Sequence, residues 1–299
     1  MTPPWLAYAC LAASMTLVGS YVGLSKLLVA VFPVFLLAWL RFGIAALAML
    51  NWVPVRAGES ALTTPQRVLM FWMSFLGNFL FSICMLYGVK LTSALAVGVT
   101  MAGIPAAVAL LSWLFLRERI GARMLVAIAL AMAGIALLAL ARGSSGAESA
   151  SVWGYALLLA ATLCEASYVV IGKRLSSHVS PKRISALINL WGLALVTPLG
   201  LWQVLTFDFR AVSASSWALL TFYALAASVV SVWLWMRGLR EVAAPRAGVF
   251  TVLLPISAAA VGIGLLGEVV TAVHVVALAL ALASLLLATW PARPATQAA

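Results

Sequence analysis

Glu165 is the acidic residue that we expect to lie deepest inside an apolar stretch of this chain. The stretch covers residues 152–175, and helical spacing places Glu165 on the same face as Tyr168. A carboxylate at the centre of a bilayer costs about 2.5–3.5 kcal/mol, so it usually faces a cavity or a partner. Glu165 therefore either contacts a substrate amine or a coupling proton, or is a structural acid that pairs with Lys173 or Arg174.

Two further stripes of polar side chains lie inside apolar runs at helical spacing. Such a stripe faces a cavity or another helix rather than lipid, because a polar group needs a hydrogen-bond partner. Both interpretations stay open, and we take the stripes as candidate substrate-binding residues. The stripes are Ser74, Asn78 and Ser82 in one run, and Ser228, Ser231 and Trp235 in another. The other candidate substrate-binding residues are Glu165, Tyr168, Thr100 and Thr251.

Two prolines inside apolar runs mark candidate hinges. Thr100 and Thr251 precede Pro105 and Pro255 by about one helical turn. A proline leaves the carbonyl about four residues earlier without its helical hydrogen bond. These bends either act as gating hinges that expose backbone acceptors beside the two threonines, or are static kinks.

Arg41 lies several residues inside the apolar run 34–54. A long basic side chain in this position can extend along the helix and keep its charged head in water. We therefore expect Arg41 to reach the membrane surface, and we prefer that interpretation to binding of a substrate carboxylate.

Metal or cofactor chemistry has no recognisable motif. The three cysteines, Cys10, Cys84 and Cys164, lie in different apolar runs, and none belongs to a CxxC pair. His178 and His274 stand alone in connections. We expect no metal and no cofactor.

The composition indicates a chain whose solvent is mostly lipid. It is 65% hydrophobic and 8% charged, whereas soluble domains have about 25% charged residues. A net charge of +11 could suggest nucleic-acid binding, but the basic residues sit in short clusters between apolar runs. We expect no nucleic-acid partner.

Apolar runs long enough to cross a bilayer define the expected elements. About 20 residues are needed, at about 1.5 Å of rise each. The prediction is an all-α integral membrane protein with ten transmembrane helices. We place them near residues 5–29, 34–54, 67–90, 93–116, 123–142, 152–175, 183–206, 214–237, 245–267 and 272–290.

The basic residues predict the orientation of these helices. If the N-terminus is cytoplasmic, 13 of the 18 Lys and Arg residues fall on the cytoplasmic side and 5 on the other. Positive charge accumulates on the cytoplasmic side of membrane proteins. We expect a multi-pass protein of a bacterial-type cytoplasmic (inner) membrane, with both termini in the cytoplasm.

The two halves of the chain share residues in the same order. One block recurs at an offset of 147 and a second at an offset of 150. The first pairs Ser20-Tyr21-Val22 with Ser167-Tyr168-Val169, and the second pairs Gly88, Gly98, Pro105 and Glu118 with Gly238, Gly248, Pro255 and Glu268. The predicted organisation is one five-helix repeat at 1–142, a linker at 143–151 and a second repeat at 152–299.

An odd number of helices per repeat means that the second copy enters the membrane from the opposite side. The connection after the fourth helix carries Arg117, Arg119 and Arg123, whereas its counterpart after the ninth carries Glu268 and no Lys or Arg. Basic residues thus accompany whichever copy faces the cytoplasm, which indicates inverted repeats.

This pattern resembles the EamA-type branch of the drug/metabolite transporter superfamily. The Pro105…Glu118 and Pro255…Glu268 pairs and the Leu40-Arg41-Phe42 segment are similar to patterns of that branch, which includes the YddG-type amino acid exporters. The resemblance implies alternating access around a central cavity. It also implies that helices one, three, four, six, eight and nine lie near the cavity, with five and ten peripheral.

We therefore expect a secondary transporter that exports small metabolites through a central cavity. Neutral, hydrophobic or aromatic amino acids are the expected substrates, the bilayer is the surroundings, and the protein is taken as a monomer. The alternatives are a multidrug or organic-cation exporter and, below it, a membrane-embedded enzyme. No Walker motif, HExxH, GxSxG or paired intramembrane acids are present, so we expect no ATP coupling and no enzymatic activity.

Overall fold

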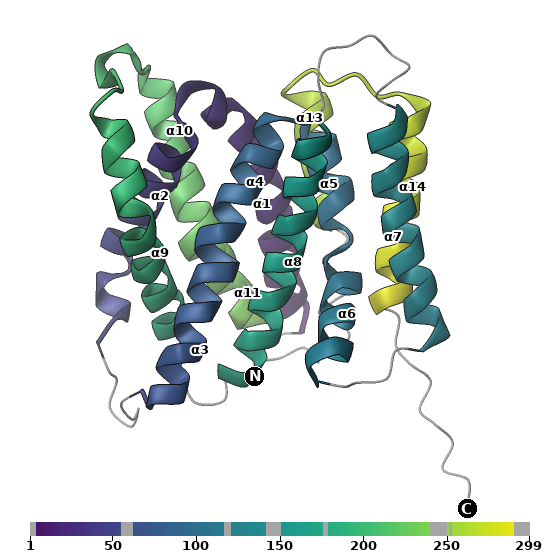
Figure 1. The fold of residues 1–299 in the computed structure, drawn as a ribbon, viewed down its shortest axis with the longest axis horizontal. Helices are drawn as coiled ribbons and strands as arrows, with labels where there is room; N and C mark the ends of the chain where they lie inside the picture. Colours follow the sequence, from purple (N-terminus) through teal and green to yellow (C-terminus); the bar gives the residue numbers. More distant parts are fainter. Residues whose placement is uncertain are drawn as a thin grey trace, which may run out of the picture.

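A computed structural model describes residues 4–54, 62–116, 121–141, 151–175, 179–239, 250 and 253–289. Within these ranges the regular structure is helical and contains no strand. Figure 1 shows the helices standing side by side, with the N-terminus at the lower edge and the connection from α13 to α14 at the upper edge. We call the edge where α1 begins the amino-terminal side, and the other the opposite side.

The helices follow the predicted apolar runs. Those of the first half are α1 (Pro4–Val31), α2 (Val34–Ala48), α3 (Thr64–Ser74), α4 (Phe81–Lys90), α5 (Ala94–Met101), α6 (Ile104–Leu116) and α7 (Ala122–Ala141). Those of the second half are α8 (Val152–Leu175), α9 (Pro181–Val204), α10 (Ala214–Leu225), α11 (Ser231–Leu239), α13 (Leu253–Gly264) and α14 (Ala272–Thr289). Two short 3-10 helices, η1 (Leu50–Trp52) and η4 (Phe209–Ala211), follow α2 and α9.

Several predicted spans contain irregular helix. A π-helical segment, η2 (Phe75–Leu80), joins α3 to α4, and another, η5 (Ala226–Val230), joins α10 to α11. The predicted helix 93–116 is interrupted at Ala102 and Gly103, between α5 and α6. Pro105 follows this interruption and has no N–H to donate to the preceding turn.

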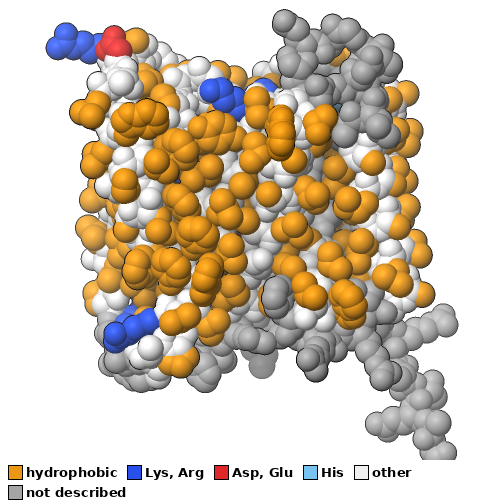
Figure 2. Space-filling model, viewed as in Figure 1, with side chains coloured by type: hydrophobic (Ala, Val, Ile, Leu, Met, Phe, Trp, Pro, Cys, Tyr) orange, Lys and Arg blue, Asp and Glu red, His pale blue; other side chains and the backbone are white. Residues whose placement is uncertain are grey.

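The length and composition of the helices fit a membrane. Four stretches of the described chain are long and apolar enough to cross one: Trp5–Val31, Thr64–Lys90, Lys182–Val204 and Ala214–Trp235. Shorter apolar helices accompany them. Figure 2 shows hydrophobic side chains over most of the face in view, with Lys and Arg near its upper and lower edges. The protein is an all-α integral membrane protein, as predicted, while the count of ten crossings stays a prediction.

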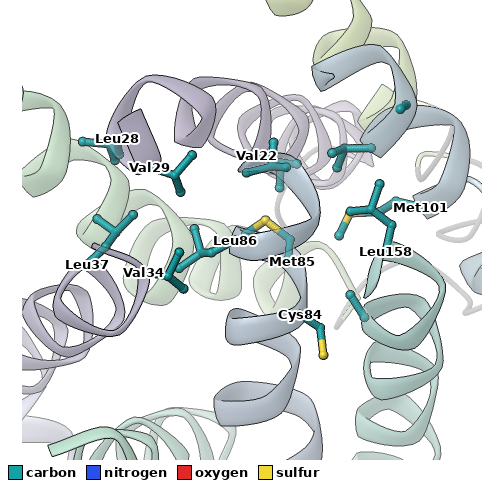
Figure 3. Packing of buried hydrophobic residues seen from close by; sticks show 14 of the residues in the cluster. Val22, Leu28, Val29, Val34, Leu37, Cys84, Met85, Leu86, Met101 and Leu158 are labelled. Atoms are coloured by element: carbon teal, nitrogen blue, oxygen red, sulfur yellow. The ribbon is translucent and has the colours of Figure 1, made fainter. Parts of the chain in front are cut away.

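The buried core forms where helices of the two halves pack together. α1 packs against α13 and α11, α2 against α9, and α4 against α8. Figure 3 shows part of this core, in which Val22 of α1, Met85 and Leu86 of α4 and Leu158 of α8 meet. At one side α7 and α14 pack along each other. Leu285 of α14 also lines the cavity described below, so the tenth predicted helix is not wholly peripheral.

Small residues let α1 approach α13 closely. Gly19 and Gly23 form a small-xxx-small pair, a sequence pattern that predicts close packing of helices. A Cβ added at Gly19 would clash with Ser257 and Leu254 and lie 2.9 Å from the backbone nitrogen of Ala258. One at Gly23 would lie 2.8 Å from Val261 Cγ1. The prediction of close packing is confirmed at both glycines.

Candidate functional site

A cavity of about 290 Å³ lies between the helices of the two halves. It is lined by residues of α1, α2, η2, α8, α9, η5 and α11, among others. Glu165 and Tyr168 lie in the half of α8 nearer the amino-terminal side, and Ser185 lies near the start of α9. The cavity therefore extends from the middle of the bundle toward the amino-terminal side.

Many lining residues occupy corresponding positions in the two halves. At an offset of 147, Val18 corresponds to Glu165 and Tyr21 to Tyr168, and all four line the cavity. At an offset of 150, the lining pairs are Gly77 with Ala227, Asn78 with Ser228, Phe81 with Ser231, and Ile104 with Leu254. The two halves thus build one cavity from equivalent positions.

Arg41 contributes a positive charge to this cavity, and the expectation that it reaches the membrane surface is wrong. Its side chain is 5% exposed and lines the cavity. Nη2 donates to Asn78 Oδ1 at 3.2 Å and to Ser82 Oγ at 2.7 Å, and the Phe42 ring centroid lies 4.2 Å from Cζ. These contacts rotate Arg41 toward η2 and α4 rather than toward lipid.

The two hydrogen bonds of Arg41 go to neutral acceptors. Nε is buried and has no partner, and among the described residues no carboxylate lies within 4 Å of the guanidinium. A buried charge without a counter-charge is costly unless something compensates it. Arg41 is therefore available to an anionic group inside the cavity.

Asn78 is held in one orientation by the helix on the other side of the cavity. Its Nδ2 donates to the Ile188 carbonyl at 3.0 Å, and the Ser74 hydroxyl donates to the same carbonyl at 2.8 Å. Since Nδ2 must be the donor there, Oδ1 faces Arg41 as an acceptor. This network ties η2 to α9 and fixes the guanidinium.

Glu165 supplies the negative charge of the cavity. It is half-buried, and no hydrogen bond or ion pair joins its carboxylate to another described residue. The side chains of Lys173 and Arg174 lie outside the described residues, and Lys173 is eight residues, or about 12 Å of rise, along α8. Tyr21 lines the same cavity as Glu165 and Arg41.

The predicted binding residues divide into two groups. Six of them line the cavity: Asn78, Glu165, Tyr168, Ser228, Ser231 and Trp235. The other three described ones are buried in helix contacts: Ser74 bonds to α9, Ser82 accepts from Arg41, and Thr100 donates to the Ala96 carbonyl at 2.8 Å. Thr251 lies outside the described residues.

One of the two predicted hinges, Pro105, lies beside irregular helix. Pro105 follows the interruption between α5 and α6, and Pro255 lies in the first turn of α13. The π-helical segments η2 and η5 occupy corresponding positions at an offset of 150, and both contribute lining residues. π-Helical turns are uncommon and are often found at functional sites.

The opposite side is closed by two charged side chains that hold the turn between α4 and α5. Lys26 Nζ donates to the carbonyls of Val89, at 2.8 Å, and of Thr92. The Glu268 carboxylate accepts from the backbone nitrogens of Ala94 and Leu95 at 2.7 and 3.0 Å. A cation at a helix C-terminus and an anion at a helix N-terminus are both favourable. We call this arrangement the Lys26–Glu268 clasp.

Aromatic rings fill the same side between α1, η4 and α10. The ring centroids of Phe32 and Phe207 lie 5.7 Å apart, and those of Phe32 and Trp217 lie 5.4 Å apart. Phe209 stacks on Trp217 at 6.2 Å. The cavity is thus separated from the opposite side by packed rings and by the clasp.

Five polar lining residues were not among the predicted binding residues: Ser14, Tyr21, Arg41, Ser185 and Asn189. The second and seventh predicted helices, which carry the last three, therefore also line the cavity. Asn189, a polar residue inside an apolar run, was a usable signal. Among the described residues, no group of three His, Cys, Asp or Glu side chains could hold a metal ion.

Comparison with known proteins places this architecture in a family. A model of the EamA-like transporter family matches residues 5–140 and again residues 152–290. The chain is 36% identical over 275 residues to the uncharacterised transporter YetK of Bacillus subtilis (strain 168), covering 91% of this chain and 83% of YetK. It is 24% identical over 253 residues to the uncharacterised transporter YyaM of that organism, covering 83% of this chain and 82% of YyaM.

A solved structure titled only "Crystal structure of protein" has the same fold. The TM-score is 0.64 at 19% identity, and the match covers 98% of this chain and 99% of the other. The family resemblance predicted from the paired Pro and Glu residues is confirmed. Together with the multi-pass helical architecture and the cavity shared by its two halves, these matches show that the chain belongs to the EamA-like transporter family, a family of membrane transporters.

Proposed function

We propose that the protein is a secondary transporter that exports small zwitterionic metabolites, with neutral, hydrophobic or aromatic amino acids as substrates. One observation carries this proposal: the cavity holds a cation, Arg41, and an anion, Glu165, that do not pair with each other. A zwitterion can compensate both charges at once. The exporter would lie in a bacterial-type cytoplasmic membrane with both termini in the cytoplasm.

The rest of the lining favours a small and largely apolar substrate. A volume of about 290 Å³ lies at the lower end of the range for small-molecule sites, about 300–1,000 Å³. Met15, Val18, Met101, Ile104 and Leu254 give the cavity apolar walls. These walls suit a neutral side chain, as in the YddG-type exporters that the sequence resembles.

Alternating access between two five-helix inverted repeats is the mechanism that we propose. The cavity extends toward the amino-terminal side, whereas the Lys26–Glu268 clasp and the aromatic cluster close the opposite side. To release substrate there, these contacts must open. The paired π-helical segments and the interruption before Pro105 are the irregular points at which the helices could bend.

A multidrug or organic-cation exporter is the second candidate, because Glu165 alone would suit a cation. Arg41 argues against it, since a second positive charge in the same cavity repels the substrate. An enzyme is less well supported still: among the described lining residues Glu165 is the one acid, and there is no His or Cys. Chemistry that needs paired acids, a histidine base or a cysteine nucleophile therefore lacks its groups among these residues.

The test is a flux screen with the purified protein in liposomes. Counterflow of radiolabelled amino acids is measured beside tetraphenylphosphonium, a lipophilic cation, with protein-free liposomes as the control. The proposal expects counterflow of leucine, phenylalanine or similar neutral amino acids. Flux of the cation without any amino acid would favour the second candidate, and no amino acid flux at all would contradict the proposal.

A further inference from the structure

Several hydrogen-bonding groups in and beside the cavity have no partner among the described residues. At Arg41, both recorded bonds use Nη2, so Nε and Nη1 have no partner among the described residues. The Tyr223 hydroxyl is also buried without a partner, and the Tyr223 ring centroid lies 5.8 Å from Arg41 Cζ. The unused nitrogens of Arg41 are donors on a charged group, while the Tyr223 hydroxyl beside it can donate or accept.

The unused acceptors come from the second half of the chain. Glu165 offers both carboxylate oxygens. Asn189 Oδ1 is buried and has no partner, while Nδ2 of the same side chain donates to the Ser185 carbonyl at 3.2 Å. Because that bond requires the NH₂ group, the free atom of Asn189 is an acceptor. An ammonium group brings three donors and needs such acceptors.

The Arg41 guanidinium is placed to bind an anion and not merely to hold the fold. A structural arginine in a membrane protein is normally paired with an acid or with backbone carbonyl oxygens. Here one nitrogen is anchored by Asn78 and Ser82, which fixes the direction of the group, and the remaining nitrogens are left over. Fixed, desolvated donors give strong charge-assisted bonds to a carboxylate.

We infer that Arg41 is the carboxylate-binding residue of the cavity and Glu165 the ammonium-binding residue. This assignment rests on the proposed transport of amino acids and adds the orientation of the substrate. The carboxylate points toward α2 and η2, and the ammonium toward α8. A ligand that lacks either group leaves one buried charge of the protein uncompensated, so both groups are required.

Three ligands with one side chain test the assignment: phenylalanine, phenethylamine without the carboxylate, and 3-phenylpropionate without the amine. Their binding to the protein in nanodiscs is measured by competition against labelled phenylalanine, and a leucine series repeats the test. Wild-type protein should bind each zwitterion at least about thirtyfold more tightly than the analogue without the carboxylate or the analogue without the amine, since an unpaired buried charge is costly. Phenylalaninamide, which keeps the amine and loses the carboxylate charge, should behave as phenethylamine does.

Two variants should then fail in opposite ways. Arg41→Gln should lower the affinity for phenylalanine to that for phenethylamine, without weakening the binding of phenethylamine. Glu165→Gln should lower the affinity for phenylalanine to that for 3-phenylpropionate, without weakening the binding of 3-phenylpropionate. Arg41→Lys, which keeps the charge but not the fork of donors, should recover part of the loss. Arg67→Gln is the matched control, because Arg67 lies at the exposed start of α3 and bonds to the Leu62 carbonyl.

The outcomes separate this assignment from the proposed function. If amino acids bind but Arg41→Gln weakens all three ligands equally, Arg41 only shapes the cavity and the assignment is overturned while the function stands. Should Arg41→Gln fail to fold, the ligand series on wild-type protein still decides. Equal affinity of phenylalanine and phenethylamine there overturns the assignment and favours an organic-cation exporter. No binding of any zwitterion overturns both.

Discussion

The two halves of the chain line one cavity with equivalent positions but different chemistry. Tyr21 and Tyr168, an offset of 147 apart, both face it, as do Ile104 and Leu254 at an offset of 150. Several of the other pairs differ in size or polarity, and one differs in charge. Glu165 stands in the second half where Val18 stands in the first.

The positive charge has the reverse distribution. Arg41 belongs to α2, in the first half, whereas the lining of α9 in the second half includes the neutral Ser185, Ile188 and Asn189. Equivalent positions therefore build the cavity, and under the proposed function the charged residues that differ between the halves select the substrate. Two kinds of substitution test this difference. One makes the two halves alike at a charged position, and the other removes a contact that only one half makes.

The largest effect is expected when the second half is given the residue of the first. Glu165→Val should lower kcat/KM for amino acid transport by about thirtyfold or more, because the substrate ammonium loses its counter-charge. The folded state should be as stable as before or more stable, since the carboxylate has no recorded partner and its burial is costly. Counterflow and thermal unfolding of the same preparation measure the two quantities.

Val18→Leu is the control for this change, because it keeps the equivalent position of the first half apolar. It should retain transport within a fewfold. Transport by Glu165→Val within twofold of wild type would mean that the difference between the halves has no part in substrate binding. A large loss of thermal stability would instead make Glu165 a structural acid.

A smaller effect is expected at the close contact of α1 with α13. Gly19→Ala places a Cβ against Ser257 and the Leu254 carbonyl, and overpacking of this kind costs about 1–3 kcal/mol. Gly43→Ala is the matched control, since no atom lies within 4 Å of the added Cβ. Thermal unfolding in detergent should show a lower Tm for Gly19→Ala and no loss for Gly43→Ala. Equal Tm values in the two variants would contradict the close packing of α1.

The Lys26–Glu268 clasp distinguishes the two sides of the molecule. Its counterpart would use Glu118, but Pro245 stands where Leu95 stands in the first half, and proline has no N–H to donate. Residues 117–120 and 240–249 lie outside the described part of the chain, so this asymmetry is read from the sequence. On the opposite side, one carboxylate accepts two backbone hydrogen bonds. The corresponding sequence on the amino-terminal side can supply at most one of them, because Pro245 has no N–H.

The clasp should contribute modestly to stability. Glu268→Ala leaves the N–H groups of Ala94 and Leu95 without their acceptor, and loss of a helix N-terminal cap costs about 0.5–2 kcal/mol. Glu268→Gln, which keeps one acceptor oxygen, should lose less. Thermal unfolding compares them, with the exposed Asp208→Asn as a control. A Tm for Glu268→Ala equal to that of wild type would show that the clasp does not hold the turn.

The sequence predicted the helices and one charged residue of the cavity, for physical reasons. Apolar runs of sufficient length have few alternatives to a membrane helix. An acid deep in such a run must face something other than lipid, and Glu165 does line the cavity. The paired prolines and glutamates likewise indicated the family.

The sequence could not say which way every polar side chain turns. Thr100 fell in a plausible position, but a hydroxyl in a helix can bond to the carbonyl four residues before it, as Thr100 does to Ala96. Arg41 has a reach that allows either the surface or the cavity, and its partners Asn78 and Ser82 come from another helix. The π-helical segments also shift the faces of these helices, and no residue type marks them.

A substrate-bound structure would show directly whether the two halves supply opposite charges to one substrate. The protein would be determined by cryo-electron microscopy or crystallography with the amino acid that gives the largest counterflow. We expect the substrate carboxylate to lie within hydrogen-bond distance of the Arg41 guanidinium, and the substrate ammonium to lie within hydrogen-bond distance of the Glu165 carboxylate. A substrate bound in the reverse orientation, or bound away from both residues, would contradict this expectation.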